Sequence, residues 1–168
     1  MDERGEFARH FAEGEVGHFG SRESVVQANL VWTSKKFTFR GMHYQVGSFR
    51  ESKLVSCLLG EISVVVADIR PDSRTFLQSL TIELSQLSRC SILVPKGVAT
   101  GYLTRSDEVL VHYYSSAPYA KDHERGFRFD DPMFEIKLPV QPKILSDRDK
   151  SWLGLDRELL YKESLDDQ

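Results

Sequence analysis

The sequence predicts an all-β protein, a jelly-roll barrel with a short helical segment near its C-terminal end. Short stretches rich in β-branched and aromatic residues recur at roughly 8–12-residue spacing, and Gly- or Pro-containing turns separate them. Strands do not alternate with helical periods, and no internal repeat is present. A jelly roll fits best because it takes many short strands and leaves a mouth for a ligand.

Each expected strand begins or ends near a turn. The strands are expected at residues 25–32, 37–45, 53–59, 62–69, 75–85, 90–94, 100–104, 108–115 and 134–138. A polar turn at 33–36 separates the first two. Gly60 and Glu61 separate the third and fourth, which is typical of a β-hairpin with glycine in a tight turn.

Turn residues also bound the later strands. Pro71 lies in the turn before the fifth strand, and Pro95 stops the sixth. A polar loop is expected at residues 116–126. Near the C-terminus, Ser146 is a candidate N-cap with aspartates in the following turn, which predicts a short helix from residue 145. Residues 157–163 are also expected to be helical.

Length and composition favour one domain over residues 1–168, with a sizeable core. The net charge of −3 gives no reason to expect nucleic acid or an anionic membrane as partner. No apolar run is long enough to span a bilayer, and the N-terminus has no signal-peptide pattern. Cys57 and Cys90 lie in apolar stretches and are expected to be buried, reduced thiols. We therefore expect a cytoplasmic protein.

The strand at residues 37–45 holds the most informative residues. Strict alternation would put Arg40 and His43 on opposite faces of a sheet. A bulge at Gly41 would re-aim one of them and bring a fixed cation and a titratable base into one cavity. The alternative is a core strand with a solvated arginine and a structural histidine.

The histidines are not spaced as the ligands of a metal site would be. His43 has no histidine two residues away, and Thr100 follows the turn at residues 95–97 where a metal-binding barrel often carries histidine. We therefore expect neither a metal nor another cofactor. General acid–base chemistry is the metal-free possibility, with His43 as base, Tyr113 as proton donor, and Arg40 and Lys53 binding a phosphate or an enolate oxygen. Each of these residues also has a purely structural interpretation.

Read together, several short segments resemble the dTDP-4-dehydrorhamnose 3,5-epimerase family of nucleotide-sugar epimerases, from residue 2 to about residue 149. The segments are DERG at 2–5, RGMHYQ at 40–45, KLV at 53–55, GE at 60–61, DIR at 68–70, VPKG at 94–97, ERG at 124–126 and ILS at 144–146. The resemblance implies a cupin-type jelly roll, dimeric and metal-independent. It also implies inversion at C3 and C5 of a dTDP-linked 4-keto-6-deoxy sugar through an enolate, in deoxysugar biosynthesis.

The resemblance also implies roles for individual residues. His43 would be the base, Asp149 the carboxylate that orients it, and Tyr113 the acid on the opposite face of the sugar. Lys53 would neutralise the enolate oxygen. The implied substrate-binding residues are Arg4 and Arg40, which would bind the diphosphate, and Gln27, Asn29, Thr100 and Tyr119.

Departures from the family pattern raise alternatives. The family usually carries histidine at the position of Thr100, an acidic residue near Arg9, and polar residues at Ala28 and Leu30. Epimerisation at C3 alone, a different nucleotide base, or a degenerate member that binds a nucleotide sugar without epimerising it are therefore open. A metal-dependent cupin enzyme is a third, weaker alternative. A strand that precedes DERG in the family is missing from the chain, so a differently built dimer edge is expected.

Overall fold

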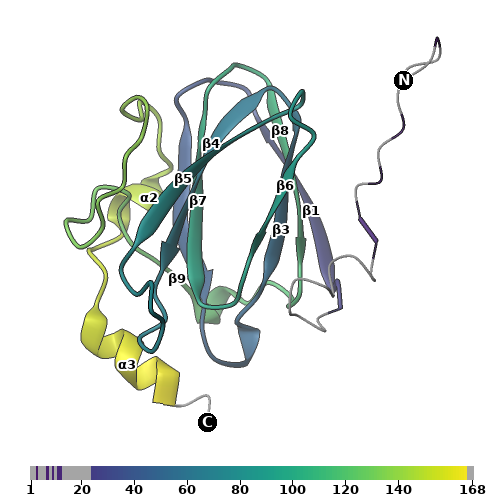
Figure 1. Cartoon of the computed structure of the whole chain (residues 1–168). Helices are drawn as coiled ribbons and strands as arrows, with labels where there is room; N and C mark the ends of the chain where they lie inside the picture. The colour runs from purple at the N-terminus through teal and green to yellow at the C-terminus, as the bar shows by residue number, and fades with distance from the viewer. Residues whose placement is uncertain (1–2, 4–6, 8, 10, 13–23, 166–168) are drawn as a thin grey trace.

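The computed structural model describes residues 3, 7, 9, 11, 12 and 24–165, which form a sandwich of two antiparallel sheets (Figure 1). The strand order is β1-β8-β3-β6 in one sheet and β5-β4-β7-β2-β9 in the other. The strands are β1 (Gln27–Thr33), β2 (Phe39–Gln45), β3 (Lys53–Leu59), β4 (Glu61–Asp68), β5 (Ser79–Ser85), β6 (Ser91–Val94), β7 (Val98–Thr104), β8 (Val109–Ser115) and β9 (Glu124–Gly126). The expected all-β jelly roll is confirmed.

The chain changes sheets at Gly60, so the hairpin predicted across Gly60 and Glu61 is wrong. β3 pairs with β6 and β8, whereas β4 pairs with β5 and β7. Gly60 has φ +77°, and a Cβ there would lie 2.5 Å from the Ser106 hydroxyl oxygen. The glycine does mark a tight turn, but this turn is a corner between the two sheets.

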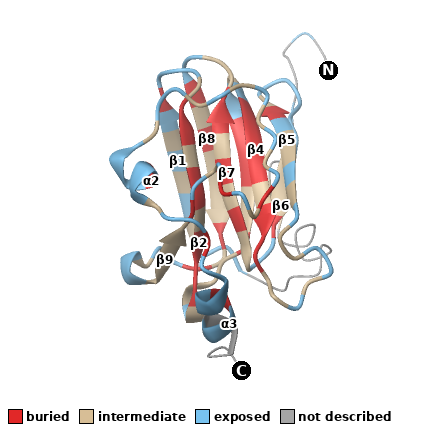
Figure 2. Cartoon of the chain, turned by 90° about the vertical axis from the view of Figure 1, so that its left-hand side faces the viewer, coloured by how far each residue is buried: buried red, intermediate tan, exposed pale blue. Residues whose placement is uncertain are grey.

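Alternation along the five-stranded sheet produces two apolar layers. Val64 of β4 faces the other sheet and packs with Val109 and Val111 of β8. Its neighbour Val65 faces the opposite way, into a second layer that the C-terminal segment covers through residues such as Phe127. Figure 2 shows the buried residues of both layers along β2, β4 and β7. The five-stranded sheet is therefore packed on both of its faces.

Residues 134–138 do not form the expected strand. Phe134 is buried in the outer layer and Ile136 packs against it, which explains the alternating pattern. Prolines at 132, 139 and 142 flank the segment and have no amide to give to a ladder. The segment contacts the sheet through the Thr81 hydroxyl, which donates to the Lys137 carbonyl at 2.9 Å. The expected loop at 116–126, in turn, contains the short strand β9.

Two short helices follow, as expected. In α2 (Asp147–Ser151), Ser146 is the N-cap and its hydroxyl oxygen accepts a hydrogen bond from the Asp149 amide. α3 (Arg157–Leu165) buries Leu160 in the outer layer. No helix among the described residues is long and apolar enough to cross a membrane.

Candidate active site

A cavity lies between the two sheets in two adjoining parts. The larger hollow has a volume of about 270 Å³ and the smaller about 110 Å³. His43, Lys53 and Tyr113 line both, so these three side chains stand where the hollows meet. The larger hollow is also lined by Val31, Arg40, Val55, Val64, Thr100, Gly101, Tyr102, Val111, Ser146, Arg148 and Asp149.

A bulge in β2 brings Arg40 and His43 into the same hollow. The pairing of β2 with β7 shifts register between these residues, with Arg40 opposite Tyr102 and His43 opposite Thr100. Gly41 has φ +134°, and a Cβ there would collide with the Cα of Gly101 on β7. The glycine thus permits a positive φ and a close approach of β2 to β7, both of which are unfavourable for a residue with a side chain. The bulge predicted at Gly41 is confirmed.

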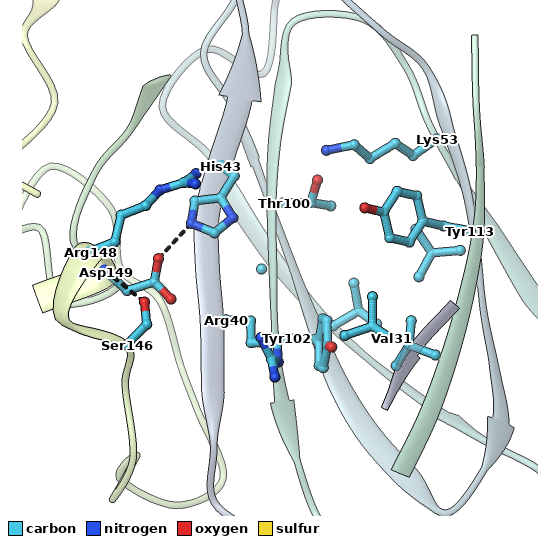
Figure 3. A pocket seen from close by; sticks show the side chains of 14 residues that line it. Val31, Arg40, His43, Lys53, Thr100, Tyr102, Tyr113, Ser146, Arg148 and Asp149 are labelled. Atoms are coloured by element: carbon cyan, nitrogen blue, oxygen red, sulfur yellow. Dashed lines mark hydrogen bonds and ion pairs between the residues drawn. The ribbon is translucent and has the colours of Figure 1, made fainter. Parts of the chain in front are cut away.

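His43 is held by a carboxylate from α2. Its Nε2 lies 2.6 Å from Oδ1 of Asp149, which is buried (Figure 3). Burial alone would raise the pKa of Asp149, but the hydrogen bond and charge of His43 outweigh it, with help from Ser146 and the Gly41 amide. The pKa of Asp149 is therefore lowered. The Trp152 ring packs edge-on to the imidazole, with centroids 6.4 Å apart.

Tyr113 faces His43 from the other sheet, across the cavity (Figure 3). Burial raises the pKa of Tyr113, and the nearby Glu51 carboxylate raises it further. The Lys53 ammonium lies 5.9 Å from the centre of the Tyr113 ring and 3.0 Å from Glu51 Oε1. Tyr113 is thus a protonated phenol with a cation beside it at neutral pH.

Two more predicted residues lie on the His43 side. Thr100 lies between His43 and Tyr113 in Figure 3, and its buried hydroxyl has no hydrogen-bond partner among the described residues. Arg40 donates from Nε to the Thr33 hydroxyl at 3.1 Å. Within the described part of the chain, this is the hydrogen bond that the Arg40 side chain makes, and Arg40 lines the larger hollow.

The smaller hollow holds the other predicted binding residues. Gln27 donates from Nε2 to Asn29 Oδ1 at 2.8 Å, and the Tyr119 amide donates to Gln27 Oε1 at 3.0 Å. The exposed Tyr119 hydroxyl donates to Glu124 Oε2 at 2.6 Å, which raises the pKa of Tyr119. Arg4 lies outside the described residues.

The structure thus brings together the described members of the predicted site and adds four residues that sequence reasoning missed: Glu51, Tyr102, Glu124 and Arg148. Glu124 forms an ion pair with Arg148, and Arg148 lies over Trp152. The sequence could have indicated Tyr102, because it follows Thr100 by two residues on one strand and therefore lies on the same face. The other three looked like ordinary surface charges.

This arrangement supports proton transfer at two faces of one ligand. A carboxylate-bound imidazole stands on one sheet and a protonated phenol on the other. Lys53 lies beside the phenol and Arg40 on the imidazole side, where both can balance negative charge in the cavity. Among the described residues, no three His, Cys, Asp or Glu side chains are arranged to hold a metal.

Known proteins share both the sequence and this fold. The family model described as dTDP-4-dehydrorhamnose 3,5-epimerase matches residues 1–157. A dTDP-4-dehydrorhamnose 3,5-epimerase of Sinorhizobium fredii (strain NBRC 101917 / NGR234) is 34% identical over 151 residues, covering 89% of this chain and 77% of that protein.

Solved structures agree with this. The dTDP-4-dehydrorhamnose 3,5-epimerase from Bacillus anthracis str. Ames, with TDP and PPi bound, has a TM-score of 0.89 and 34% identity, covering 92% of this chain and 89% of that one. A dTDP-6-deoxy-D-glucose-3,5-epimerase from Legionella pneumophila Philadelphia 1, in complex with dTDP-4-keto-L-rhamnose, has a TM-score of 0.88 and 32% identity, covering 95% and 86%.

Proposed function

The chain belongs to the dTDP-4-dehydrorhamnose 3,5-epimerase family, and on this premise we propose that it epimerises a dTDP-linked 4-keto-6-deoxy sugar in deoxysugar biosynthesis. The observation that carries the proposal is the pair of proton-transfer groups on opposite walls of one cavity, His43 and Tyr113. Inversion at a carbon requires a proton to leave one face of the ring and another to arrive at the opposite face.

The proposed reaction needs no redox step. The 4-keto group acidifies the C–H bonds at C3 and C5. His43 accepts the proton from one of these carbons, and the bonding electrons move into an enolate whose negative charge rests on the C4 oxygen. Tyr113 then donates its hydroxyl proton to the opposite face of that carbon, and the keto group re-forms. Asp149 orients His43 and stabilises its protonated form.

Cations in the cavity would stabilise the negative charges of substrate and intermediate. We propose that Lys53 lies against the enolate oxygen, and that Arg40, together with Arg4, binds the diphosphate. A net charge of −3 gives the whole protein no attraction for such a ligand, so these local cations must supply it. Gln27, Asn29 and Tyr119 would contact the nucleotide from the smaller hollow, and Thr100 the sugar.

We further propose that the protein is a homodimer. The outer face of the β1-β8-β3-β6 sheet carries exposed apolar side chains: Leu30 is 65% exposed, Trp32 51% and Leu58 43%. Phe11 already packs on this face, with its ring centroid 4.9 Å from that of Tyr114. An apolar face of this kind indicates a protein partner, and a second copy of the chain is the partner that the family resemblance implies.

As to its setting, we propose that residues 1–168 act as one domain in the cytoplasm. Cys57 and Cys90 are both free thiols, as is usual in a reducing compartment. Cys57 is buried as expected, whereas Cys90 is exposed.

Proton NMR of the protein with dTDP-4-keto-6-deoxyglucose in D₂O tests the proposed function. Deuterium at both C3 and C5 is the expected result, and deuterium at C3 alone would restrict the activity to one centre. Binding of dTDP without exchange at either carbon would contradict the proposal.

A further inference from the structure

The hydroxyl of Tyr102 is a buried polar group that forms no hydrogen bond of normal geometry within the described part of the chain. Tyr102 lines the larger hollow from β7, two residues beyond Thr100 and on the same face of the strand. Its hydroxyl oxygen is inaccessible to solvent and has no hydrogen bond of normal geometry to a described residue. Figure 3 shows Tyr102 below Thr100, on the same side of the cavity as Arg40.

This hydroxyl works against the stability of the ligand-free protein. Burying a hydroxyl without a hydrogen bond is unfavourable, whereas a phenylalanine ring would fill the same space without that penalty. Around the ring, Val64 is its cross-strand neighbour on β4, and Val31 and Val111 line the same hollow. None of these valine side chains can satisfy the hydroxyl. The nearby Thr33 hydroxyl accepts a hydrogen bond from Arg40 Nε and forms none of normal geometry with Tyr102, so the hydroxyl indicates a ligand atom that pairs with it.

The neighbour of Tyr102 on β2 shows what chemistry that ligand has. Arg40 is the cross-strand partner of Tyr102, and both side chains line the larger hollow. Lys53 and Arg148 also line this hollow, but they pair with Glu51 and Glu124. Among the described residues no carboxylate pairs with Arg40, whose Nε bonds to Thr33. A guanidinium and a phenol therefore project from paired positions toward the same space, which suits one oxygen-rich group.

We infer that Tyr102 is a substrate-binding residue whose hydroxyl donates a hydrogen bond to the oxygen-bearing group that Arg40 also binds. This inference rests on the proposed function, because the ligand is then a nucleotide sugar. The accepting oxygen belongs either to the diphosphate or to the sugar itself. Burial raises the pKa of Tyr102 although Thr33 and the Arg40 charge oppose the rise, so the phenol keeps its proton at neutral pH.

The test is Tyr102→Phe, which removes only the hydroxyl. Titration calorimetry with dTDP and with dTDP-glucose, which has no keto group to react, measures binding without turnover. Tyr102→Phe should bind dTDP-glucose about 10-fold to 100-fold more weakly than wild type. Its melting temperature without ligand should be unchanged or higher. Tyr161→Phe is the matched control, because this tyrosine lies on α3 against Phe76 and does not line the cavity.

Comparing the two ligands shows which part of the nucleotide sugar carries the oxygen that accepts the Tyr102 hydrogen bond. Equal weakening for dTDP and dTDP-glucose assigns it to the diphosphate, and weakening for dTDP-glucose alone assigns it to the sugar. Unchanged affinity for both overturns the inference, as does weaker binding with a lower melting temperature, which would mean a structural role. Wild-type protein that binds neither ligand would instead overturn the proposed function.

Discussion

Asp149 reaches His43 from a helix 106 residues further along the chain, and the bond between them determines which imidazole nitrogen can accept a proton. Because Asp149 contacts Nε2, the neutral ring carries its hydrogen there and leaves Nδ1 as the acceptor. Figure 3 shows this second nitrogen on the cavity side of the ring. The geometry therefore favours Nδ1 as the atom that takes a proton from the sugar.

Asp149→Asn should lower kcat about 100-fold with a smaller change in KM, because the amide no longer stabilises the protonated imidazole. Steady-state kinetics with the 4-keto sugar nucleotide measures both constants. Asp147→Asn is the control, since Asp147 lies on the same short helix with a fully exposed side chain. Equal kcat values for Asp149→Asn and Asp147→Asn would show that Asp149 does not assist His43.

Sequence reasoning found different parts of the site with different success. Arg40 and His43 stood out because a glycine between them signals a bulge. The pairing of Asp149 with His43 joins distant segments, so only the family resemblance indicated it. Tyr102 escaped notice because an aromatic residue in a strand usually belongs to the core, and only the folded cavity shows its hydroxyl to be unpaired.

Among the elements, β2 is the one whose shape decides the site. Its bulge depends on Gly41, where φ is +134° and a Cβ would collide with Gly101. Gly41→Ala should therefore lower the free energy of unfolding by at least about 2 kcal/mol. It should also displace His43 and reduce activity in the protein that folds.

Urea unfolding and the D₂O exchange assay check this prediction. The control is Gly47→Ala, because Gly47 also has positive φ (+62°) but a Cβ there would approach His123 no closer than 3.6 Å. Gly47→Ala should lower the free energy of unfolding by about 1 kcal/mol, from backbone strain alone. Equal losses for the two variants would mean that the contact with Gly101 is unimportant.

The turn after β4 is held by Asp68. This buried carboxylate accepts hydrogen bonds from Arg70 Nε at 2.8 Å, Ser73 at 2.5 Å and Thr75 at 2.6 Å. Burial alone would raise the pKa of Asp68, but these donors outweigh it and lower the pKa well below its ordinary value of 3.8. The turn thus depends on an ionised aspartate.

A lowered pKa means that Asp68 contributes stability above pH 3.8, and that this contribution is lost as the pH falls below that value. Asp68→Asn should cost about 3 kcal/mol at neutral pH and should flatten the loss of stability as the pH falls from about 4 to about 2. Urea unfolding across this range measures both effects. Asp72→Asn changes an exposed residue in the same turn, and it should alter neither the stability at neutral pH nor its loss in acid. Parallel acid profiles for wild type and Asp68→Asn would contradict the assignment.

Alternation and turn residues predicted the strands well because most of them have one buried face. The hairpin at Gly60 was wrong because a tight turn and a corner between sheets use the same glycine conformation. The prediction of a strand at 134–138 was wrong because alternation shows which side chains are buried but not whether the backbone pairs with another strand. Phe134 and Ile136 are covered without any ladder.

At the scale of the whole molecule, the two sheets are covered differently. The C-terminal segment covers the outer face of the five-stranded sheet, whereas Leu30, Trp32 and Leu58 of the other sheet stay exposed. The sequence pattern does not predict which outer face is covered and which stays exposed, because both outer faces carry apolar side chains. The second copy proposed above accounts for the difference.

Sedimentation velocity should therefore find a dimer for the wild-type chain and a monomer for Trp32→Glu, because a charge placed in an apolar interface opposes association. Leu87→Glu is the control, since Leu87 is 78% exposed in the turn between β5 and β6 and should leave the dimer intact. A wild-type monomer at micromolar concentration would rule out the proposed assembly.

The central claim is that His43 and Tyr113 serve opposite faces of the sugar, and NMR of the Tyr113→Phe variant in D₂O tests it most directly. In this variant His43 should still remove the proton and return deuterium to the same face. The substrate should therefore gain deuterium without changing configuration, while His43→Ala should show neither exchange nor inversion. Inverted product from Tyr113→Phe at the wild-type rate, or exchange that persists in His43→Ala, would contradict the account.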